Sequence, residues 1–254
     1  MLRSTFLHLP GVGPATEAAL WRDGIRDWRE LAEGAHPLGT SPAHRERLRA
    51  ELAASEAALA GGDAGWFGRR LPAGEHWRVY SAFRERTAFL DIETTALSPY
   101  EGMVTVVAVH GGGATRSFVA GEDLEELPAY LGRFPVLVTF NGRYFDVPFL
   151  EATFPAFVAP PVHIDLRFLC YRIGLSGGLK RIETTLGIGD RTGVEGIRGL
   201  DAVRLWREYR AGSAAALERL VRYNRADTVN LEPLLERVAG DLVRRLLPPP
   251  LPSR

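Results

Sequence analysis

The stretch "AFLDIETTAL", residues 88–97, sets two carboxylates in a run whose other residues are typical of a buried β-strand. Side chains alternate between the two faces of a strand, so Asp91 and Glu93 lie on the same face. Carboxylates held that close repel and raise each other's pKa unless a cation lies between them. The pattern therefore indicates a divalent metal at this strand.

The bulk composition indicates a soluble globular protein. Its 254 residues, 46% of them hydrophobic, are enough for one substantial core and a small second module. Lys and Arg total 31, as do Asp and Glu, so a nucleic-acid partner would need a local patch or a metal. The single cysteine, Cys170, excludes an intrachain disulfide and fits a reducing compartment.

We expect a cytoplasmic location and no membrane span. No apolar run approaches the roughly 20 residues that cross a bilayer. The first residues break at Pro10 and Gly11 before a signal-peptide core could form.

Four parts follow one another along the chain. Residues 1–60 have short apolar repeats with Gly and Pro punctuation, which predicts a small helical module. Residues 61–86 mix glycine, arginine and aromatics without periodicity, and we expect a connector that packs on the next domain. Residues 87–243 form the main domain, and the Pro-rich tail, 244–254, cannot continue a helix.

The main domain reads as an α/β fold. Strand-like runs occur at "TAFLDIET", "MVTVVAVH" and "TRSFVAG", with "GGGA" predicting a hairpin between the last two. A helical stretch "EDLEELPAYLGRF", a strand "VLVTFNG", a helix from about Phe145 and a short strand "PVHIDL" come next, and the rest is helical. This order predicts a mixed sheet flanked by helices, compatible with a ribonuclease-H-like fold, preceded by a small all-helical module.

Two further acidic residues lie at positions that suit chemistry. Asp146, in "TFNGRYFDVPFL", comes just beyond a strand end, where loops commonly carry function. Asp227 lies in the helical segment "RYNRADTVNLEPLL". Taken singly, Asp146 could cap a helix and Asp227 could be a solvated helix residue. The combination is more specific than either residue.

Three motifs, "DIET", "FNGRYFD" and "YNRAD", resemble in order those of the DEDD (DnaQ-like) exonuclease superfamily, which has the ribonuclease-H-like fold. The stretches "GGLKRIETTLGI" and "GLDAVRLWREYRAG" are further similar to the bacterial YprB-like ribonuclease-H-like proteins. The resemblance covers roughly residues 87–240. It implies a nuclease that cleaves phosphodiester bonds with the help of metal ions.

The resemblance implies a site for two Mg²⁺ or Mn²⁺ ions about 4 Å apart. The residue matching Asp91 bridges both metals, and those matching Glu93 and Asp227 hold the ion that activates water. Asp146 would act through the water shell of the second metal. Hard cations prefer oxygen ligands, which accounts for carboxylates at all four positions.

The superfamily divides on the residue that orients the attacking water, a histidine five residues before the last aspartate or a tyrosine four before it. Here Arg222 and Tyr223 occupy these positions, so the chain resembles the tyrosine branch. On a helix, the i, i+4 spacing sets Tyr223 and Asp227 on one face. A phenol with an ordinary pKa near 10 is a poor base, so Tyr223 would position the water. The alternative is a core aromatic.

Four more residues are candidates for substrate contact. Thr94 and Thr95 follow the first motif, where the family grips the terminal nucleotide, although turn or core roles fit them too. Asn141 matches an asparagine near the scissile phosphate, or is an Asx-turn residue. Lys180 lies where a glycine-rich turn enters a helix, which suits a phosphate, or is a solvated helix start. Asp165 is expected to accept backbone hydrogen bonds.

The amino-terminal stretch "FLHLPGVGPATEAALWRDGIRDWRELAEG" resembles a helix-hairpin-helix motif. In that motif a "GVG" hairpin exposes backbone N–H groups to a nucleic-acid phosphate without reading bases. Gly11 and Gly13 would permit such a close approach. Similar hairpins also serve as structural or protein-contact elements.

The sequence therefore predicts a metal-dependent nuclease, with a 3′-to-5′ exonuclease on single-stranded DNA or RNA ends as the first hypothesis. A non-catalytic nucleic-acid-binding protein of the same fold is one alternative, and clustered acids without a metal to bind would only lower its stability. A structure-specific endonuclease using the same metal site is another. The choice between DNA and RNA rests on contacts to a 2′-hydroxyl, which the motifs do not specify.

Overall fold

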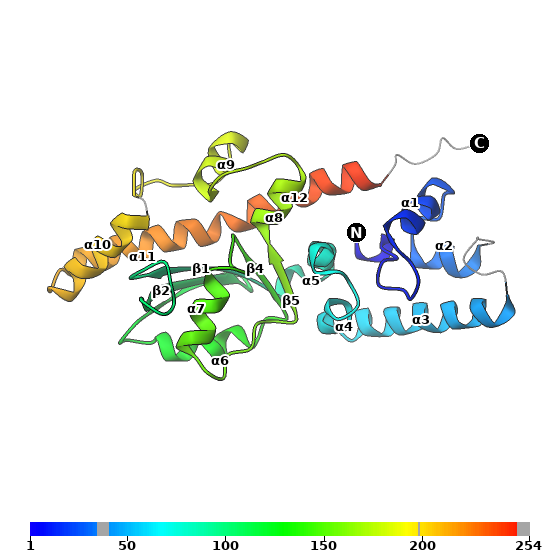
Figure 1. Ribbon diagram of the computed structural model, residues 1–254, viewed down its shortest axis with the longest axis horizontal. Helices are drawn as coiled ribbons and strands as arrows, with labels where there is room; N and C mark the ends of the chain where they lie inside the picture. The colour runs from blue at the N-terminus through cyan, green and yellow to red at the C-terminus, as the bar shows by residue number, and fades with distance from the viewer. Residues whose placement is uncertain (35–40, 198, 248–254) are drawn as a thin grey trace. The chain divides into compact units, whose positions relative to one another are not determined.

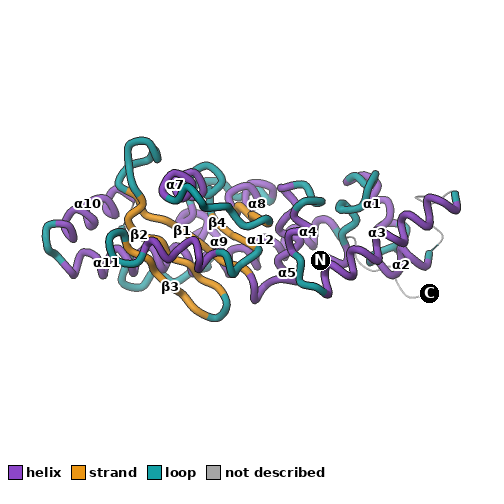
Figure 2. Tube along the Cα trace, turned by 90° about the horizontal axis from the view of Figure 1, so that it is seen from below, coloured by secondary structure: helices purple, strands orange, loops and turns teal. Residues whose placement is uncertain are grey.

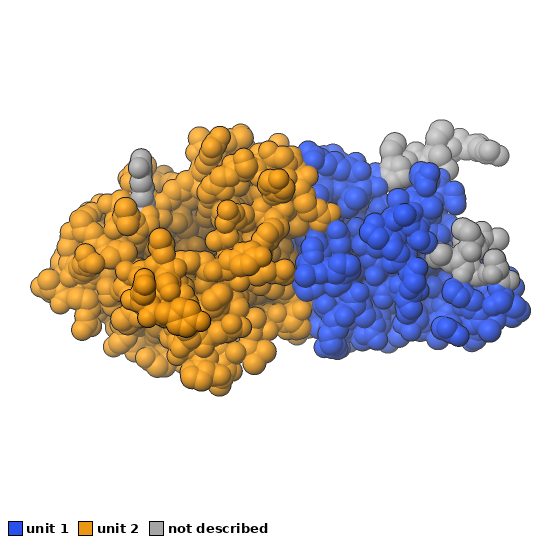
Figure 3. All heavy atoms as spheres, in the orientation of Figure 1, with its two compact units in different colours: residues 1–84, 239–254 blue, residues 85–238 orange. Residues whose placement is uncertain are grey.

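The chain folds into two compact units, residues 1–84 with 239–254 and residues 85–238, which Figure 3 colours separately. The structure, a computed structural model, describes residues 1–34, 41–197 and 199–247. Within these ranges, no helix combines the length and the apolar composition that crossing a membrane requires.

The first unit is built from short helices. They are η1 (Leu2–Ser4), α1 (Pro14–Arg22), α2 (Trp28–Glu33), α3 (Pro42–Ala60), α4 (Ala64–Gly68), η2 (Ala73–Val79) and α5 (Tyr80–Phe83), followed by η3 (Arg84–Arg86) at its boundary. Helices α2, α3 and α4 each begin at a side chain, Asp27, Ser41 or Asp63, that accepts a hydrogen bond from a backbone N–H of the first turn. These caps fix where the helices start.

Residues 61–84 belong to this first unit, which corrects the expectation of a connector packed on the following domain. The buried guanidinium of Arg78 donates to Glu17 at 2.8 Å and to Thr5 Oγ1 at 2.7 Å. The ring of Phe67 stacks on Trp28 with centroids 5.9 Å apart. The segment therefore completes the core of the amino-terminal module, because its aromatics and arginine find their partners there.

The second unit contains one five-stranded mixed sheet, as predicted. Its strands are β1 (Thr87–Thr94), β2 (Val104–Gly111), β3 (Ala114–Val119), β4 (Val136–Thr139) and β5 (Val162–Asp165), in the order β3-β2-β1-β4-β5. Strands β1, β2 and β3 pair antiparallel, and β1–β4 and β4–β5 pair parallel. Gly112 and Gly113, with φ of +59° and +78°, form the predicted β2–β3 hairpin turn.

Helices cover both faces of this sheet, so the predicted α/β class is confirmed. The helices of this unit are η4 (Leu124–Glu126), α6 (Leu127–Leu131), α7 (Asp146–Thr153), α8 (Leu166–Arg172), α9 (Leu179–Leu186), α10 (Gly199–Arg210) and α11 (Ala214–Val229), together with the first part of α12 (Leu231–Leu246). Helices α6 and α7 lie on one face and α11 on the other (Figures 1 and 2). Because β1 is central, its side chains are enclosed from both sides.

The carboxyl-terminal boundaries differ from the expectation. The second unit ends at Val238, inside the continuous helix α12, and not at residue 243. The predicted tail, 244–254, likewise begins inside this helix, and residues 248–254 lie outside the described residues. An uninterrupted helical pattern gives no sequence signal for a boundary within it.

His8 is a buried, neutral histidine in the first unit. Its Nε2 lies 2.9 Å from Ser55 Oγ, and its ring lies 5.2 Å from Trp28 and 5.9 Å from Phe67, between centroids. Burial, with a smaller contribution from the charge of Arg70, lowers the pKa of His8 to about 4. Charging this ring therefore opposes folding.

We predict that acidification destabilises the first unit through His8. Between pH 6.5 and about 4, His8 binds a proton in the unfolded chain but not in the folded chain. The free energy of unfolding therefore decreases as the pH is lowered through this range, by about 3 kcal/mol in total. Denaturation followed by tryptophan fluorescence measures this loss. His8→Phe should remove it and the exposed control His44→Asn should keep it; an equal pH dependence in both variants would contradict the assignment.

Candidate metal centre

Three carboxylates converge at the junction of β1 and α11. Asp91 and Glu93 lie two apart on β1, and the pairing register with β2 shifts directly after Glu93, so the ladder is irregular beside the site. One carboxylate oxygen each of Asp91, Glu93 and Asp227 lies within 4.8 Å of the other two. We call these three residues the carboxylate cluster.

Burial and mutual repulsion act together on the cluster. The pKa values of Asp91 and Glu93 are raised well above the ordinary range, first by burial and next by the charge of Asp227. Lys180 acts in the opposite direction on Glu93. Oxygen donors in this arrangement suit a hard divalent cation, which would relieve the repulsion.

Asp146, the fourth predicted acid, lies at the edge of this group. It is the first residue of α7 and is buried, and the helix is capped by Phe145, so Asp146 is not its N-cap. Burial first, then the charge of Asp165, raise its pKa to about 7. Its own charge raises the pKa of Asp91 and Glu93, although its oxygens are not among those that converge within 4.8 Å.

Asn224 orients the first carboxylate. Its buried Nδ2 donates to Asp91 O at 3.0 Å and to Asp91 Oδ2 at 2.8 Å. Asn224 lies on α11 three residues before Asp227. One turn of this helix therefore supplies the Asp227 carboxylate and the amide that holds Asp91. Sequence reasoning missed Asn224, although its place in "YNRAD" was a usable signal.

Tyr223 and Lys180 form one hydrogen-bonded pair beside the cluster. Lys180 Nζ donates to Tyr223 Oη at 2.5 Å and to Ile197 O at 2.6 Å, and it lies 4.1 Å from the centroid of the tyrosine ring. Burial first, and then the charge of Asp227, raise the pKa of Tyr223 well above its ordinary value, so the phenol keeps its proton. Lys180 is thus directed at the cluster, and its alternative as a solvated helix start is wrong.

Arg191 is a cation beside the cluster that sequence reasoning missed. Its Nη1 contacts Asp227 Oδ1, and its Nη2 lies 2.5 Å from Glu183 Oε2. The carboxylates of Asp227 and Glu183 are both buried. The guanidinium of Arg191 lies between them and forms an ion pair with each. Arg191 follows the glycine-containing run "GIGD", far from Asp227 in sequence, so no periodic pattern marked it.

The loop between β4 and α7 is held in a defined conformation. Asp165 accepts hydrogen bonds from the backbone N–H of Asn141 (2.8 Å), Arg143 (3.1 Å) and Arg167 (3.1 Å), which confirms its expected role. Asn141 has φ of +67°, the only positive value at a non-glycine among the described residues. At Gly142 a Cβ would meet Thr139 Oγ1 at 2.3 Å, so only glycine fits.

The polar side chains of three predicted substrate residues are engaged by other groups of the protein. Thr94 Oγ1 donates to Ala96 O at 2.6 Å, and Thr95 Oγ1 accepts from Met103 N at 3.0 Å. Asn141 Oδ1 accepts from Arg167 Nη1 at 2.7 Å. Thr94 and Thr95 nevertheless line a cavity of about 790 Å³ next to Glu93 and helix α10, which we call the terminal cavity.

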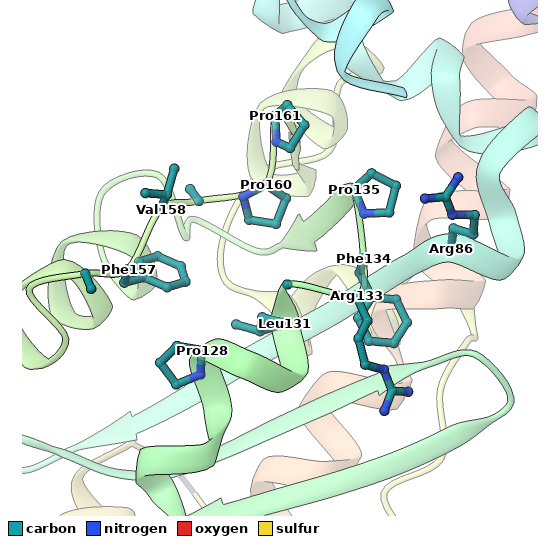
Figure 4. A pocket seen from close by; sticks show the side chains of 13 residues that line it. Arg86, Pro128, Leu131, Arg133, Phe134, Pro135, Phe157, Val158, Pro160 and Pro161 are labelled. Atoms are coloured by element: carbon teal, nitrogen blue, oxygen red, sulfur yellow. The ribbon is translucent and has the colours of Figure 1, made fainter. Parts of the chain in front are cut away.

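A different cavity, of about 420 Å³, lies at the other end of the parallel strands (Figure 4). Its walls include Pro135 and Pro161, the residues directly before β4 and β5, and the labelled Pro128 and Pro160. The acids Asp146 and Asp165 lie at the carboxyl ends of these strands or beyond. This proline-rich cavity therefore has no part in the carboxylate cluster.

The amino-terminal hairpin is present only in part. Gly11, with φ of +79°, forms the turn, and Gly13 is the N-cap of α1. Before the turn, the single helical element of the described residues is the three-residue η1, so the first helix of the expected motif is not formed. A Cβ at Gly11 or Gly13 would meet no atom within 4 Å, so the backbone there is open to approach.

Similarity to a solved structure with a TM-score above 0.5 supports the fold. The chain is similar to the family B DNA polymerase from the hyperthermophilic archaeon Pyrobaculum calidifontis, with a TM-score of 0.52 and 19% identity over 65% of this chain. It covers 26% of that polymerase. It is also similar to a structure of Brucella melitensis NrnC with bound Mg²⁺, with a TM-score of 0.45 and 21% identity over 64% of this chain and 76% of that one.

Among curated proteins, no match was found. The family model of the RNase_H superfamily matches residues 88–239, which is more than half of the chain. The match includes β1 with Asp91 and Glu93, the β4–α7 loop, and α11 with Asp227. The chain belongs to the RNase_H superfamily.

Proposed function

We propose that this protein is a metal-dependent nuclease that removes nucleotides from the 3′ ends of single-stranded DNA or RNA. The observation that carries the proposal is the convergence of three carboxylate oxygens within 4.8 Å in a chain of the RNase_H superfamily. Two bound Mg²⁺ or Mn²⁺ ions would supply a hydroxide near neutral pH and relief of charge on the leaving oxygen. The donor set fits such ions, since all its members are carboxylates.

Each acid of the site has a distinct task in this proposal. Asp91, held by Asn224, would be shared by both ions. Glu93 and Asp227 would hold the ion on the side where water is activated. Asp146, at the edge of the cluster, would act on the second ion through water.

Tyr223 would position the attacking water. Lys180 donates to the phenol oxygen and the phenol's own proton is engaged by Asp227, so the second lone pair of that oxygen would accept from the water and align it. A phenol whose pKa lies well above the ordinary value is unsuited to remove a proton at neutral pH. Tyr223 would thus orient the attacking water, and Lys180 would hold the tyrosine hydroxyl in place.

The terminal cavity favours action at a strand end. Its apolar wall includes Leu97 and Leu200, both highly exposed, and its rim carries Arg204 and Arg207. Apolar surface beside cations suits a nucleotide, because the faces of its base are apolar and its phosphate is anionic. With Glu93 in its lining, the cavity would hold the last nucleotide next to the cluster.

The amino-terminal hairpin would add a second, sequence-blind contact. The open backbone at Gly11 and Gly13 allows a phosphate to approach the N-terminus of α1, where unpaired N–H groups point outward. Contact with a protein partner is the alternative use of this surface.

End-labelled single-stranded, duplex and flapped DNA and RNA, incubated with Mg²⁺, Mn²⁺ or EDTA, test the activity itself. A ladder of shortened products with metal supports the exonuclease. One discrete product would support the structure-specific endonuclease, and retarded mobility without cleavage would support a non-catalytic binding protein.

We predict that Mg²⁺ or Mn²⁺ raises the Tm of the chain and that Asp91→Ala removes most of this gain together with cleavage. The reason is that a bound cation relieves the repulsion that raises the pKa of Asp91 and Glu93. Thermal melts with metal and with EDTA measure the gain. Glu218→Ala, an exposed acid elsewhere on α11, is the control, and an equal gain in Asp91→Ala would overturn the metal assignment.

Tyr223→Phe should lower turnover by about 100-fold and leave the metal-dependent rise in Tm nearly unchanged, because the hydroxyl aligns water and does not bind metal. Single-turnover cleavage and paired melts measure the two quantities. Loss of the metal response in Tyr223→Phe would show that the hydroxyl is a ligand.

Arg191→Gln should lower the free energy of unfolding in EDTA by about 1–3 kcal/mol, because Asp227 and Glu183 lose their shared cation. Saturating Mn²⁺ should narrow the difference from wild type, since the metal replaces part of the lost charge. The control is Arg222→Gln, which breaks an exposed pair with Glu218 on the same helix. A loss no larger than that of the control would contradict this role for Arg191.

Gly13→Ala tests the hairpin contact without a steric clash, since its Cβ would meet no neighbouring atom. We expect weaker binding to long single strands, a smaller salt dependence of that binding, and unchanged turnover on short oligonucleotides, because only phosphate contacts are lost. Binding titrations at several salt concentrations provide the measurement. Unchanged affinity and salt slope would favour a structural or protein-contact role.

A further inference from the structure

A cavity of about 550 Å³ lies between the β4–α7 loop and helices α8 and α9. Three aromatic side chains line it while remaining exposed: Tyr144 at 70%, Phe168 at 42% and Tyr171 at 76%. They are three of the nine large hydrophobic side chains that the described residues expose, so a third of these residues gather in one place. Exposed rings contribute little to the core, which indicates a binding surface.

Two of the rings pack at an angle to each other. The centroids of Tyr144 and Phe168 are 5.9 Å apart and their planes are inclined at 60°. Tyr171 follows Phe168 on α8 by three residues, which places both on one side of the helix. The three rings therefore form a concave aromatic surface with room for another flat ring.

The polar part of the cavity is cationic. Arg167 lines it and is held by the hydrogen bond from its Nη1 to Asn141 Oδ1. Among the described residues no acidic side chain lines the cavity. The buried Asp165 is engaged by three backbone N–H donors of the surrounding loops. The cavity thus combines aromatic faces with a positive charge, which suits an anionic ligand that carries flat rings.

The cavity adjoins the carboxylate cluster through two elements. In the β4–α7 loop, Tyr144 lines this cavity, Phe145 lines the terminal cavity, and Asp146 lies at the edge of the cluster. On α9, Ile182 lines this cavity while Lys180 reaches Tyr223. A strand whose end lies in the terminal cavity would therefore have a neighbouring nucleotide within reach of the aromatic surface.

We propose that this cavity binds an unpaired nucleobase of the substrate strand, stacked on Tyr171 and Tyr144, with Arg167 contacting the adjoining phosphate. The inference rests on the proposed function. Every base has a π-face, so such stacking accepts all sequences, whereas in a duplex the neighbouring bases cover these faces. The cavity would thus supply the preference for single strands.

The test measures binding separately from cleavage. The full chain carrying Asp91→Asn, kept in EDTA, binds a fluorescent single-stranded oligonucleotide, and anisotropy gives the Kd. Added Tyr171→Ala should weaken binding by about 5- to 150-fold, and Tyr171→Phe should retain it, because the ring is the binding group. The control is Val158→Ala, an equally exposed residue (84%) of the proline-rich cavity, which should leave the Kd unchanged.

A walk of single abasic nucleotides from the 3′ end locates the stacked base. At one position, removing the base should weaken binding as much as Tyr171→Ala does. Removing the same base should not weaken binding further when the protein already carries Tyr171→Ala. Unchanged affinity in Tyr171→Ala, or losses that add at every position, would overturn the inference. Absence of any binding by the Asp91→Asn parent would also overturn the inference, whereas the proposed function is decided by cleavage alone.

Cleavage by the wild-type chain with Mg²⁺ separates the two proposals. If shortened products form but the losses from Tyr171→Ala and from each abasic position simply add, the proposed nuclease function is supported and the aromatic site is refuted. If the two losses do not add at one position but no shortened products form, the aromatic site is supported and the protein is a non-catalytic nucleic-acid-binding protein.

Discussion

The repulsion among buried carboxylates is the constraint on which the rest of the second unit depends. β1 is the central strand, so Asp91 and Glu93 are carried into the interior, and α11 covers them with a third acid, Asp227. The folded chain tolerates this arrangement with raised pKa values on β1. A fold that needed only stability would place apolar side chains at these positions.

The compensating groups are distributed unevenly around the cluster. Asp227 has a guanidinium, that of Arg191, in direct contact, whereas the side-chain hydrogen bond of Asp91 among the described residues comes from the neutral amide of Asn224. The charge of Lys180 lowers the pKa of Glu93. The ammonium itself donates its hydrogen bonds to Tyr223 and to a backbone oxygen. The β1 side of the cluster therefore has the largest uncompensated charge, and a divalent cation gains most there.

Local patterns predicted those features that depend on local geometry. Alternation along β1 predicted a shared face for Asp91 and Glu93, and helical spacing predicted the same for Tyr223 and Asp227. The partners of these acids were not predictable in that way, since Arg191 meets Asp227 across 36 positions and lies in a loop without a period. Residues 61–84 were misassigned for a similar reason: their partners, such as Glu17 for Arg78, are set by tertiary packing.

The β4–α7 loop shows how a short rigid segment can serve several sites at once. Asp165 binds backbone N–H groups at both ends of the turn, and close packing on Thr139 requires glycine at position 142. With the backbone fixed, three successive side chains, Tyr144, Phe145 and Asp146, enter three different environments. Their separation is then set by covalent geometry, so a base on one side of the loop and a strand end on the other keep a constant distance from the carboxylates.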